Sequence, residues 1–131
     1  MKPLVLDTNV LIRFLERGGD YAETFSKFDR LLIPAVVDGE YRTGIDVATN
    51  SGLRRQKAFD ALLGSSAVEY VPVGREVSSE YAKVFRQLQE RGTPIPQNDI
   101  WIAATALVRH APLYSLDDHF KNVEELELVG L

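Results

Sequence analysis

Four acidic residues lie where the surrounding sequence is mostly apolar. They are Asp7, Glu40, Asp99 and Asp117. A carboxylate beside an apolar stripe is costly unless it is paired or binds a cation, and four carboxylates in one crevice cannot all stay ionised without one. Ligand sets that offer only oxygen suit Mg²⁺ or Mn²⁺, and such ions activate water against phosphodiesters. If the fold brings the four residues together, they predict a metal-dependent site for phosphodiester cleavage.

Each acid also has an ordinary structural explanation. Asp7 is a suitable N-cap for the helix that follows it, and a flexible Glu40 could reach past the edge of the core. Asp99 is favoured in a first helical turn by the helix dipole. Asp117 could form an Asx-turn, and Asp118 could do so equally well. The local sequence therefore leaves the role of each acid open.

The elements that must position these acids alternate along the chain. Short apolar strands are expected at residues 3–6, 31–33, 68–73 and 113–115, with a weaker one at 126–129. Apolar residues at helical spacing predict helices at residues 10–15, 20–28, 34–48, 53–63, 77–88 and 100–108. This alternation predicts an α/β fold with a mostly parallel sheet of four to five strands, covered by helices on both faces. Ligands bind such sheets at the carboxyl ends of the strands, where Asp7 and Asp117 would lie.

Three local features refine this expectation. Asp20 and Glu23 have the spacing of a capping box at a helix start. Residues 50–52, Asn-Ser-Gly, are expected to break the chain before the next helix. Gly39 falls inside the helix of Glu40, where glycine costs about 1 kcal/mol. We therefore expect that helix to bend or to begin later.

Length and composition indicate one globular domain spanning residues 1–131. No apolar run reaches the roughly 20 residues of a membrane span, and the N-terminus lacks the pattern of a secretory signal. The chain has no cysteine, which excludes disulfides, thiolate metal sites and Cys nucleophiles. We therefore expect a cytoplasmic protein that does not enter a membrane.

The charge balance bears on whether this chain binds nucleic acid. The net charge of −4 argues against it, but setting aside the four candidate ligands leaves 15 acidic and 15 basic residues. Arg54, Arg55 and Lys57 cluster, and Arg13 and Arg17 follow the first strand and helix. These residues could guide a phosphate backbone, although basic residues on helices are usually solvated.

Four segments together resemble the signature segments of PIN-domain nucleases. They are residues 6–10 (LDTNV), Glu40 in the helix after the second strand, residues 98–104 (NDIWIAA) and residues 115–120 (SLDDHF). The resemblance extends from residue 3 to about residue 129, and the chain is similar in size to the VapC toxins of prokaryotic toxin–antitoxin pairs. It implies a PIN-like three-layer α/β/α sandwich and an endoribonuclease that depends on Mg²⁺ or Mn²⁺.

The resemblance also implies roles for individual residues. Asp7 and Asp99 would be the principal metal ligands, and Glu40 and Asp117 would complete the site or orient the water. Asp117 is favoured over its neighbour because the family pattern has a Ser or Thr two residues earlier and an aromatic residue three later. The residues expected to support the ligands by hydrogen bonds are Thr8, Asn9, Asn98 and Ser115. His119 is interpreted as structural or solvent-facing and not as a ligand.

The partners implied by the resemblance are an RNA substrate, a small VapB-like antitoxin and a second copy of the chain. One alternative is a PIN-fold module that binds RNA or protein without catalysis, which would be marked by a missing acid. The other is a receiver-like domain that accepts a phosphoryl group on Asp. Such a domain needs an acidic pair near the end of its first strand and a Lys after a late strand, and neither is present here.

Overall fold

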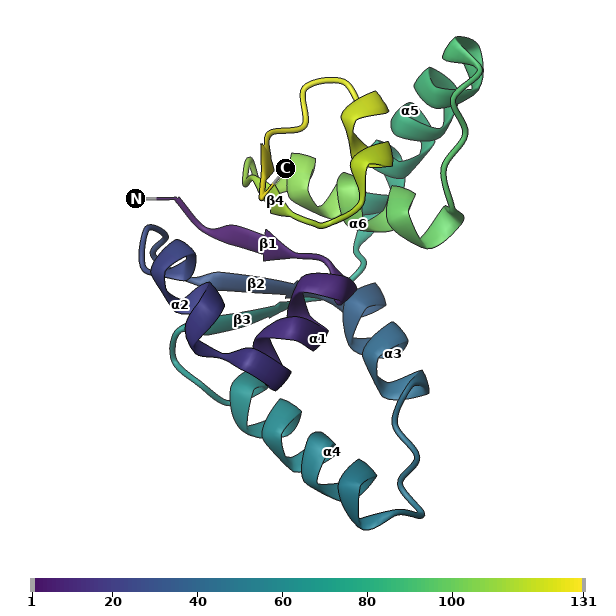
Figure 1. The fold of residues 1–131 in the computed structure, drawn as a ribbon. Coiled ribbons are helices and arrows are strands. Elements are labelled where there is room, and N and C mark those ends of the chain that lie inside the picture. Colours follow the sequence, from purple (N-terminus) through teal and green to yellow (C-terminus); the bar gives the residue numbers. More distant parts are fainter. Residues whose placement is uncertain (1, 131) are drawn as a thin grey trace.

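The computed structural model describes residues 2–130, and a five-stranded sheet runs through its centre (Figure 1). The strands are β1 (Leu4–Leu6), β2 (Leu31–Pro34), β3 (Val68–Val71), β4 (Leu113–Tyr114) and β5 (Leu128–Val129). They lie in the order β3-β2-β1-β4-β5, and every neighbouring pair is parallel. The predicted α/β fold with a parallel sheet is confirmed.

Six α-helices connect and cover the strands (Figure 1). They are α1 (Thr8–Arg17), α2 (Gly19–Phe25), α3 (Ala35–Thr43), α4 (Asn50–Leu63), α5 (Arg75–Arg91) and α6 (Gln97–Val108), and a short 3₁₀ helix, η1, spans Asp118–Asn122. Helices α5 and α6 pack against each other, and α4 contacts the edge strand β3. None of the helices described for residues 2–130 has the length and apolarity needed to span a membrane.

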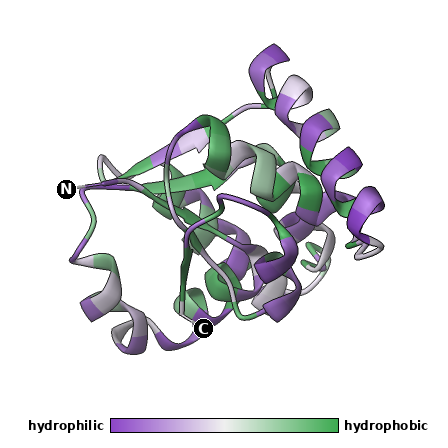
Figure 2. Cartoon of the chain, turned by 90° about the horizontal axis from the view of Figure 1, so that it is seen from above, coloured by the Kyte–Doolittle hydropathy of each residue, from purple (hydrophilic) through white to green (hydrophobic). Residues whose placement is uncertain are grey.

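Successive side chains of a strand point to opposite faces of the sheet, and an apolar cluster lies on each face. Leu4 pairs with Leu31, and both belong to a cluster completed by aromatic residues of α2 and the segment after it. Val5 pairs with Leu32, and both belong to the larger cluster with residues of α3, α4, α5 and α6. Figure 2 shows the hydrophobic residues concentrated in the middle of the molecule. This two-sided burial holds the short strands rigidly in the core.

Apolar residues bury helix α6 in the core. Ala103, Ala104 and Ala106 are fully buried, together with Ile102. Helix α5 ends at Arg91, and the left-handed backbone of the following Gly92 (φ 69°) caps it before the chain turns into α6. The first turn of α6 is thereby placed beside the ends of the central strands.

The predicted boundary between the third and fourth helices is wrong. Helix α3 ends at Thr43, and α4 already begins at Asn50, so residues 50–52 form its first turn and do not break the chain. The Thr49 hydroxyl accepts a hydrogen bond from the Gly52 N–H at 3.0 Å and caps the helix. The break lies instead between these helices, at residues 44–49.

Other local predictions also need correction. Asp20 is not an N-cap, because α2 begins at Gly19 after Gly18, whose backbone is left-handed (φ 36°). The strand expected at residues 68–73 ends at Val71, since the following Pro72 has no N–H to donate to the ladder. Helix α3 continues through Gly39 without a break.

The order of the strands reverses beside β1. The chain passes from β1 outward to β2 and β3, and then returns to place β4 on the other side of β1. The carboxyl ends of β1 and β4 therefore meet at the switch point of the sheet, which is where α/β folds bind ligands.

Candidate acidic metal centre

A crevice of about 590 Å³ opens at this switch point. Its lining residues are Asp7, Thr8, Asn9, Ile12, Glu40, Pro96, Gln97, Asn98, Asp99 and Asp117. The structure thus brings together all four acids and three of the four supporting residues that the sequence singled out. The sequence did not predict that Ile12, Pro96 and Gln97 also line the crevice. Pro96 and Gln97 directly precede the segment of Asp99.

Asp7 is anchored at the end of β1 and is only 3% exposed. Its backbone N–H donates to the Tyr114 carbonyl at 3.0 Å, which joins the end of β1 to that of β4. Its carboxylate accepts a bond from the Thr8 N–H at 2.8 Å and another from the Ser115 hydroxyl at 2.7 Å. Asp7 is also the N-cap of α1. The capping explanation is therefore correct, and it coexists with a place in the crevice.

The environment of Asp7 disfavours its ionised form. Burial raises the pKa of this carboxyl above its ordinary value, and the charges of Asp117 and Glu40 raise it further. The two hydrogen bonds, from Ser115 and Thr8, oppose this rise. A buried carboxylate among other carboxylates is a group that a cation would stabilise.

Glu40 projects from α3 toward the crevice. The Thr8 hydroxyl donates to its Oε1 at 2.8 Å, so the start of α1 fixes the direction of this side chain. Thr8 therefore supports two acids, Asp7 through its backbone and Glu40 through its side chain. Because α3 is continuous through Gly39, the expected bend does not redirect Glu40.

Asp99 lies in the first turn of α6 and faces the other acids. Its pKa is raised to about 6, first by burial and then by the charge of Asp7. Pro96 occupies the N-cap position, and the helix has no side-chain cap, so Asn98 lines the crevice without capping α6. The helix dipole explains why an acid is tolerated here, but not why it is enclosed beside other acids.

Ser115 connects the acids that follow the two central strands. Its hydroxyl donates to Asp7 and accepts a bond from the Asp117 N–H at 3.0 Å. Asp117 is exposed but lines the crevice, whereas the neighbouring Asp118 begins η1 and does not line it. Of the two adjacent acids, the structure therefore places the one that the family pattern favoured in the site.

Asn9 supports the same turn from the opposite side. Its Oδ1 accepts a bond from the Leu116 N–H at 3.3 Å. This contact joins the first turn of α1 to the segment after β4, next to Asp117. Asn9 therefore positions the loop of the crevice and does not bond to a carboxylate.

His119 contacts the acidic cluster, which agrees with a structural role for this residue and not with a solvent-facing one. Its Nε2 lies 2.7 Å from Oδ2 of Asp99. Donor atoms of Asp99, Asp117 and His119 all lie within 4.8 Å of one another, as in a group that could hold a metal ion. The ring packs against buried Phe120, with 4.8 Å between the ring centroids. The short turn of η1, which has no apolar periodicity, aims the imidazole at α6.

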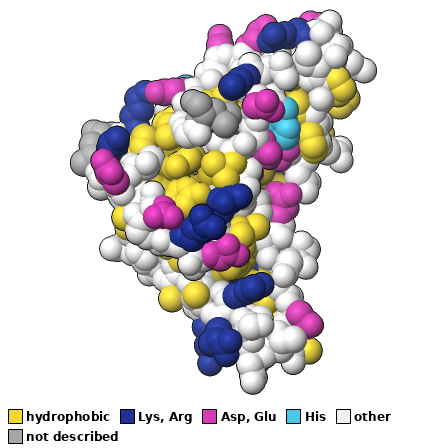
Figure 3. Space-filling model, in the orientation of Figure 1, with side chains coloured by type: hydrophobic (Ala, Val, Ile, Leu, Met, Phe, Trp, Pro, Cys, Tyr) yellow, Lys and Arg dark blue, Asp and Glu magenta, His cyan; other side chains and the backbone are white. Residues whose placement is uncertain are grey.

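The chemistry of these donors fits a hard divalent cation. Carboxylate oxygens come from the residue after β1, from α3, from α6 and from the loop after β4, and hard cations prefer such oxygen ligands. In Figure 3, Asp and Glu side chains gather between the upper and lower parts of this face, next to a His side chain.

The sequence matches the family model of the PIN domain over residues 4–126. It is 32% identical to a protein named Ribonuclease VapC from Rickettsia bellii (strain RML369-C), over 96% of this chain and 94% of that protein. It is 35% identical to Ribonuclease VapC5 from Mycobacterium tuberculosis (strain ATCC 25618 / H37Rv), over 88% of this chain and 84% of that protein.

Solved structures show the same architecture. The fold matches VapBC-1 from nontypeable Haemophilus influenzae with a TM-score of 0.83 and 25% identity, covering 97% of this chain and 96% of that one. It matches VapBC-5 from Mycobacterium tuberculosis, a member of the VapBC family of toxin–antitoxin systems, with a TM-score of 0.73 and 27% identity over both full chains.

Proposed function

This chain belongs to the PIN-domain family, and on that premise we propose that it is a metal-dependent endoribonuclease that hydrolyses RNA phosphodiester bonds. The observation that carries the proposal is the crevice at the switch point, where four acids from four separate segments line one cavity. The relatives named as VapC ribonucleases support RNA as the substrate.

In this proposal Asp7 and Asp99 hold the metal ion, and Glu40 and Asp117 complete the site or orient the attacking water. When bound, the ion supplies a water of lowered pKa and stabilises charge on the phosphate. The chain fixes the direction of Asp7 through Ser115 and of Glu40 through Thr8. Asn9 and Asn98 support the rim of the crevice. We propose Mg²⁺ or Mn²⁺ as the cofactor, because the four acids offer only oxygen.

We also propose that the enzyme is the toxin of a toxin–antitoxin pair, held inactive by a VapB-like antitoxin. Structures similar to this chain are VapBC complexes, which supports a partner of that kind. Residues 1–131 are proposed to form a single PIN domain, as the family match over residues 4–126 supports. Its RNA substrate makes the cytoplasm the proposed place of action.

A homodimer is proposed on the outer face of α5 and α6. Phe85 is 44% exposed there and borders an apolar hollow of about 320 Å³. Leu88, Pro94 and Ile95 also line this hollow. Light scattering of the purified protein tests this proposal: Phe85→Glu is expected to shift a dimer to monomer, and a monomeric parent would contradict it.

The activity is tested by incubating the purified protein with structured RNAs and Mg²⁺ or Mn²⁺. We expect cleavage that EDTA abolishes and that Asp7→Ala and Asp99→Ala lose. Asp117→Asn and Asp118→Asn form a matched pair, since only the first residue lines the crevice. We expect the first variant to lose activity and the second to keep it.

The same experiment separates the alternatives. Cleavage that survives EDTA or the Asp7→Ala change would contradict the proposed mechanism. RNA binding by the parent without cleavage in either metal would favour a binding module that lacks catalysis. Phosphorylation of an Asp by a small phosphodonor such as acetyl phosphate, without RNA cleavage, would favour a receiver-like domain.

A further inference from the structure

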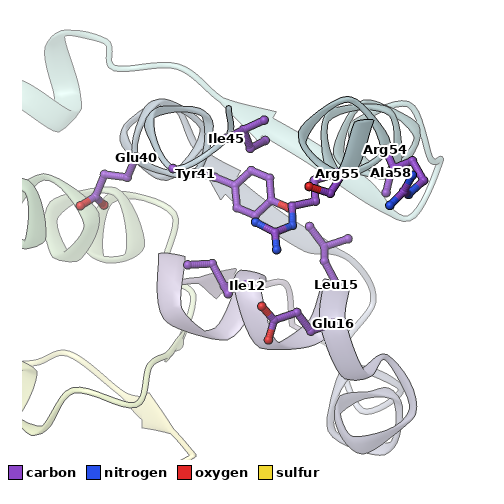
Figure 4. A pocket seen from close by; sticks show the side chains of 11 residues that line it. Ile12, Leu15, Glu16, Glu40, Tyr41, Ile45, Arg54, Arg55 and Ala58 are labelled. Carbon is purple, nitrogen blue, oxygen red and sulfur yellow. The ribbon is translucent and has the colours of Figure 1, made fainter. Parts of the chain in front are cut away.

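A second hollow of about 450 Å³ continues from the acidic crevice, and we call it the α1–α4 groove. Its lining residues are Ile12, Leu15, Glu16, Glu40, Tyr41, Gly44, Ile45, Ser51, Arg54, Arg55 and Ala58. Ile12 and Glu40 line both hollows, so the groove leads directly away from the candidate metal centre. Figure 4 shows Glu40 at one end of the groove and Arg54 at the other.

The groove has an apolar floor between Glu40 at one end and Arg54 at the other, and Glu16 of α1 also lines it. Ile12 and Leu15 of α1 lie opposite Tyr41 and Ile45, and Ile12 remains 40% exposed. In Figure 4, Arg55 reaches from α4 toward Tyr41. Tyr41 is only 8% exposed and packs against Phe59, so Ile12 and Leu15 provide the accessible apolar surface of the groove. An apolar surface beside a guanidinium can hold the sugar or base of a nucleotide.

Arg54 and Arg55 are unpaired charges within the described structure. Arg30, Arg42 and Arg109 each contact a carboxylate, whereas no carboxylate of residues 2–130 forms an ion pair with Arg54 or Arg55. Lys and Arg side chains are visible over the region of α4 in Figure 3. A polyanion that enters the acidic crevice would meet these positive charges where the groove ends.

We propose that the α1–α4 groove is a nucleotide subsite of the enzyme, which binds the nucleotide next to the scissile phosphate of a single RNA strand. Arg54 and Arg55 bind the backbone phosphate, and the sugar or base lies against Ile12 and Leu15. This inference rests on the proposed ribonuclease function. It assigns the path of the substrate away from the metal centre and makes both arginines positioning residues.

The test measures binding of a fluorescein-labelled 12-nucleotide RNA of mixed sequence by anisotropy. The Asp99→Asn background is used so that the probe is not cut. Arg54→Gln/Arg55→Gln is expected to weaken binding at least about tenfold. It is also expected to reduce the salt slope of log K by about 1.4, the value for two lost phosphate contacts on a single strand.

Matched variants separate a local contact from general charge. Lys27→Gln/Arg75→Gln removes two exposed charges outside the groove and is expected to change binding less than threefold. Ala58→Phe fills the groove without changing charge and is expected to weaken RNA binding, with folding checked by circular dichroism. In the otherwise unchanged protein, the arginine variants are expected to raise KM for RNA while kcat stays within about threefold and Mn²⁺ affinity is retained.

Equal RNA affinity and salt slope in the arginine variant and its background would overturn the inference while leaving the ribonuclease function intact. The same holds if the arginine and Ala58→Phe variants lose binding to a polypeptide partner but not to RNA, which would assign the groove to a protein. If the unchanged protein neither binds nor cuts RNA, both the inference and the proposed function are wrong.

Discussion

The hydroxyl of Ser115 donates a 2.7 Å hydrogen bond to Oδ2 of Asp7, across 108 positions of sequence. This bond ties the end of β4 to the end of β1, the two strands that flank the switch point of the sheet. The same hydroxyl accepts the Asp117 N–H, so one buried side chain orders two of the four acids. The geometry of the crevice therefore depends on a residue that does not line it.

Replacing Ser115 with Ala should loosen the metal centre more than the fold. A hydrogen bond to a charged group contributes about 1.5–3 kcal/mol, and partners of metal ligands typically affect metal affinity 10- to 100-fold. We expect a comparable loss of Mn²⁺ affinity by calorimetry, with a further rise in the pKa of Asp7. Ser78→Ala serves as the control, because it removes an exposed hydroxyl of α5 that donates to the Gly74 carbonyl. Undiminished Mn²⁺ binding by Ser115→Ala would refute this role.

Thr8→Val tests whether Glu40 must be oriented by its hydrogen bond. Valine keeps the shape of threonine but cannot donate to Oε1 of Glu40. We expect RNA cleavage to fall about tenfold, the effect of losing roughly one hydrogen bond, with a small change in Tm. The control is Thr43→Val, because the Thr43 hydroxyl bonds the backbone carbonyl of the same Glu40. Equal activity in the two variants would show that the orientation of Glu40 by Thr8 does not matter.

The sequence was sufficient to find the acids because their local surroundings are distinctive. Asp7 ends an apolar strand, and a parallel sheet necessarily brings the ends of its strands to one edge. Asp99 lies in the first turn of α6, a strongly apolar helix. Choosing Asp117 over Asp118 depended on the family pattern, since both residues suit the local turn equally well. The sequence therefore predicted which acids share a crevice. It did not determine which side chains donate hydrogen bonds to them.

The sequence did not predict features of the structure that depend on contacts between distant segments. The helical spacing of apolar residues continues to Ala48, but the chain leaves the helix at Gly44 and the Thr49 cap starts the next one. His119 lies in a single 3₁₀ turn, which is too short for any periodicity to indicate its direction. Its contact with Asp99 follows from how η1 docks on α6, which is a tertiary property.

Asp99→Asn should stabilise the metal-free protein at neutral and higher pH. The folded protein holds the Asp99 proton up to a pKa of about 6, whereas the unfolded chain releases it near 3.8. The folded state therefore binds more protons between these values, and the free energy of unfolding falls as the pH rises through about 4–6. Two pKa units correspond to about 3 kcal/mol at most, so we expect the variant to gain about 1–3 kcal/mol above pH 6.

The measurement is thermal unfolding of both proteins in EDTA from pH 4 to pH 8. The gap in Tm should be small at pH 4, where Asp99 is protonated and resembles Asn, and should widen toward pH 8. Saturating Mn²⁺ should reverse the order, because only the parent keeps the ligand. A variant less stable than the parent at pH 8 in EDTA would mean that Asp99 stabilises the fold instead of straining it.

Gly52→Ala and Gly39→Ala should change stability in opposite directions, although both glycines are helical. A Cβ on Gly52 would lie 1.8 Å from the Asp46 carbonyl oxygen, so the capped start of α4 must shift. We expect a loss of about 1–3 kcal/mol, as for overpacking elsewhere. A Cβ on Gly39 meets nothing within 4 Å, and the alanine should gain about 0.5–1 kcal/mol. Urea unfolding measures both changes. A Gly52→Ala variant with unchanged stability would show that the turn before α4 shifts at little cost.

Because α4 forms one wall of the α1–α4 groove, only Gly52→Ala should also weaken RNA binding.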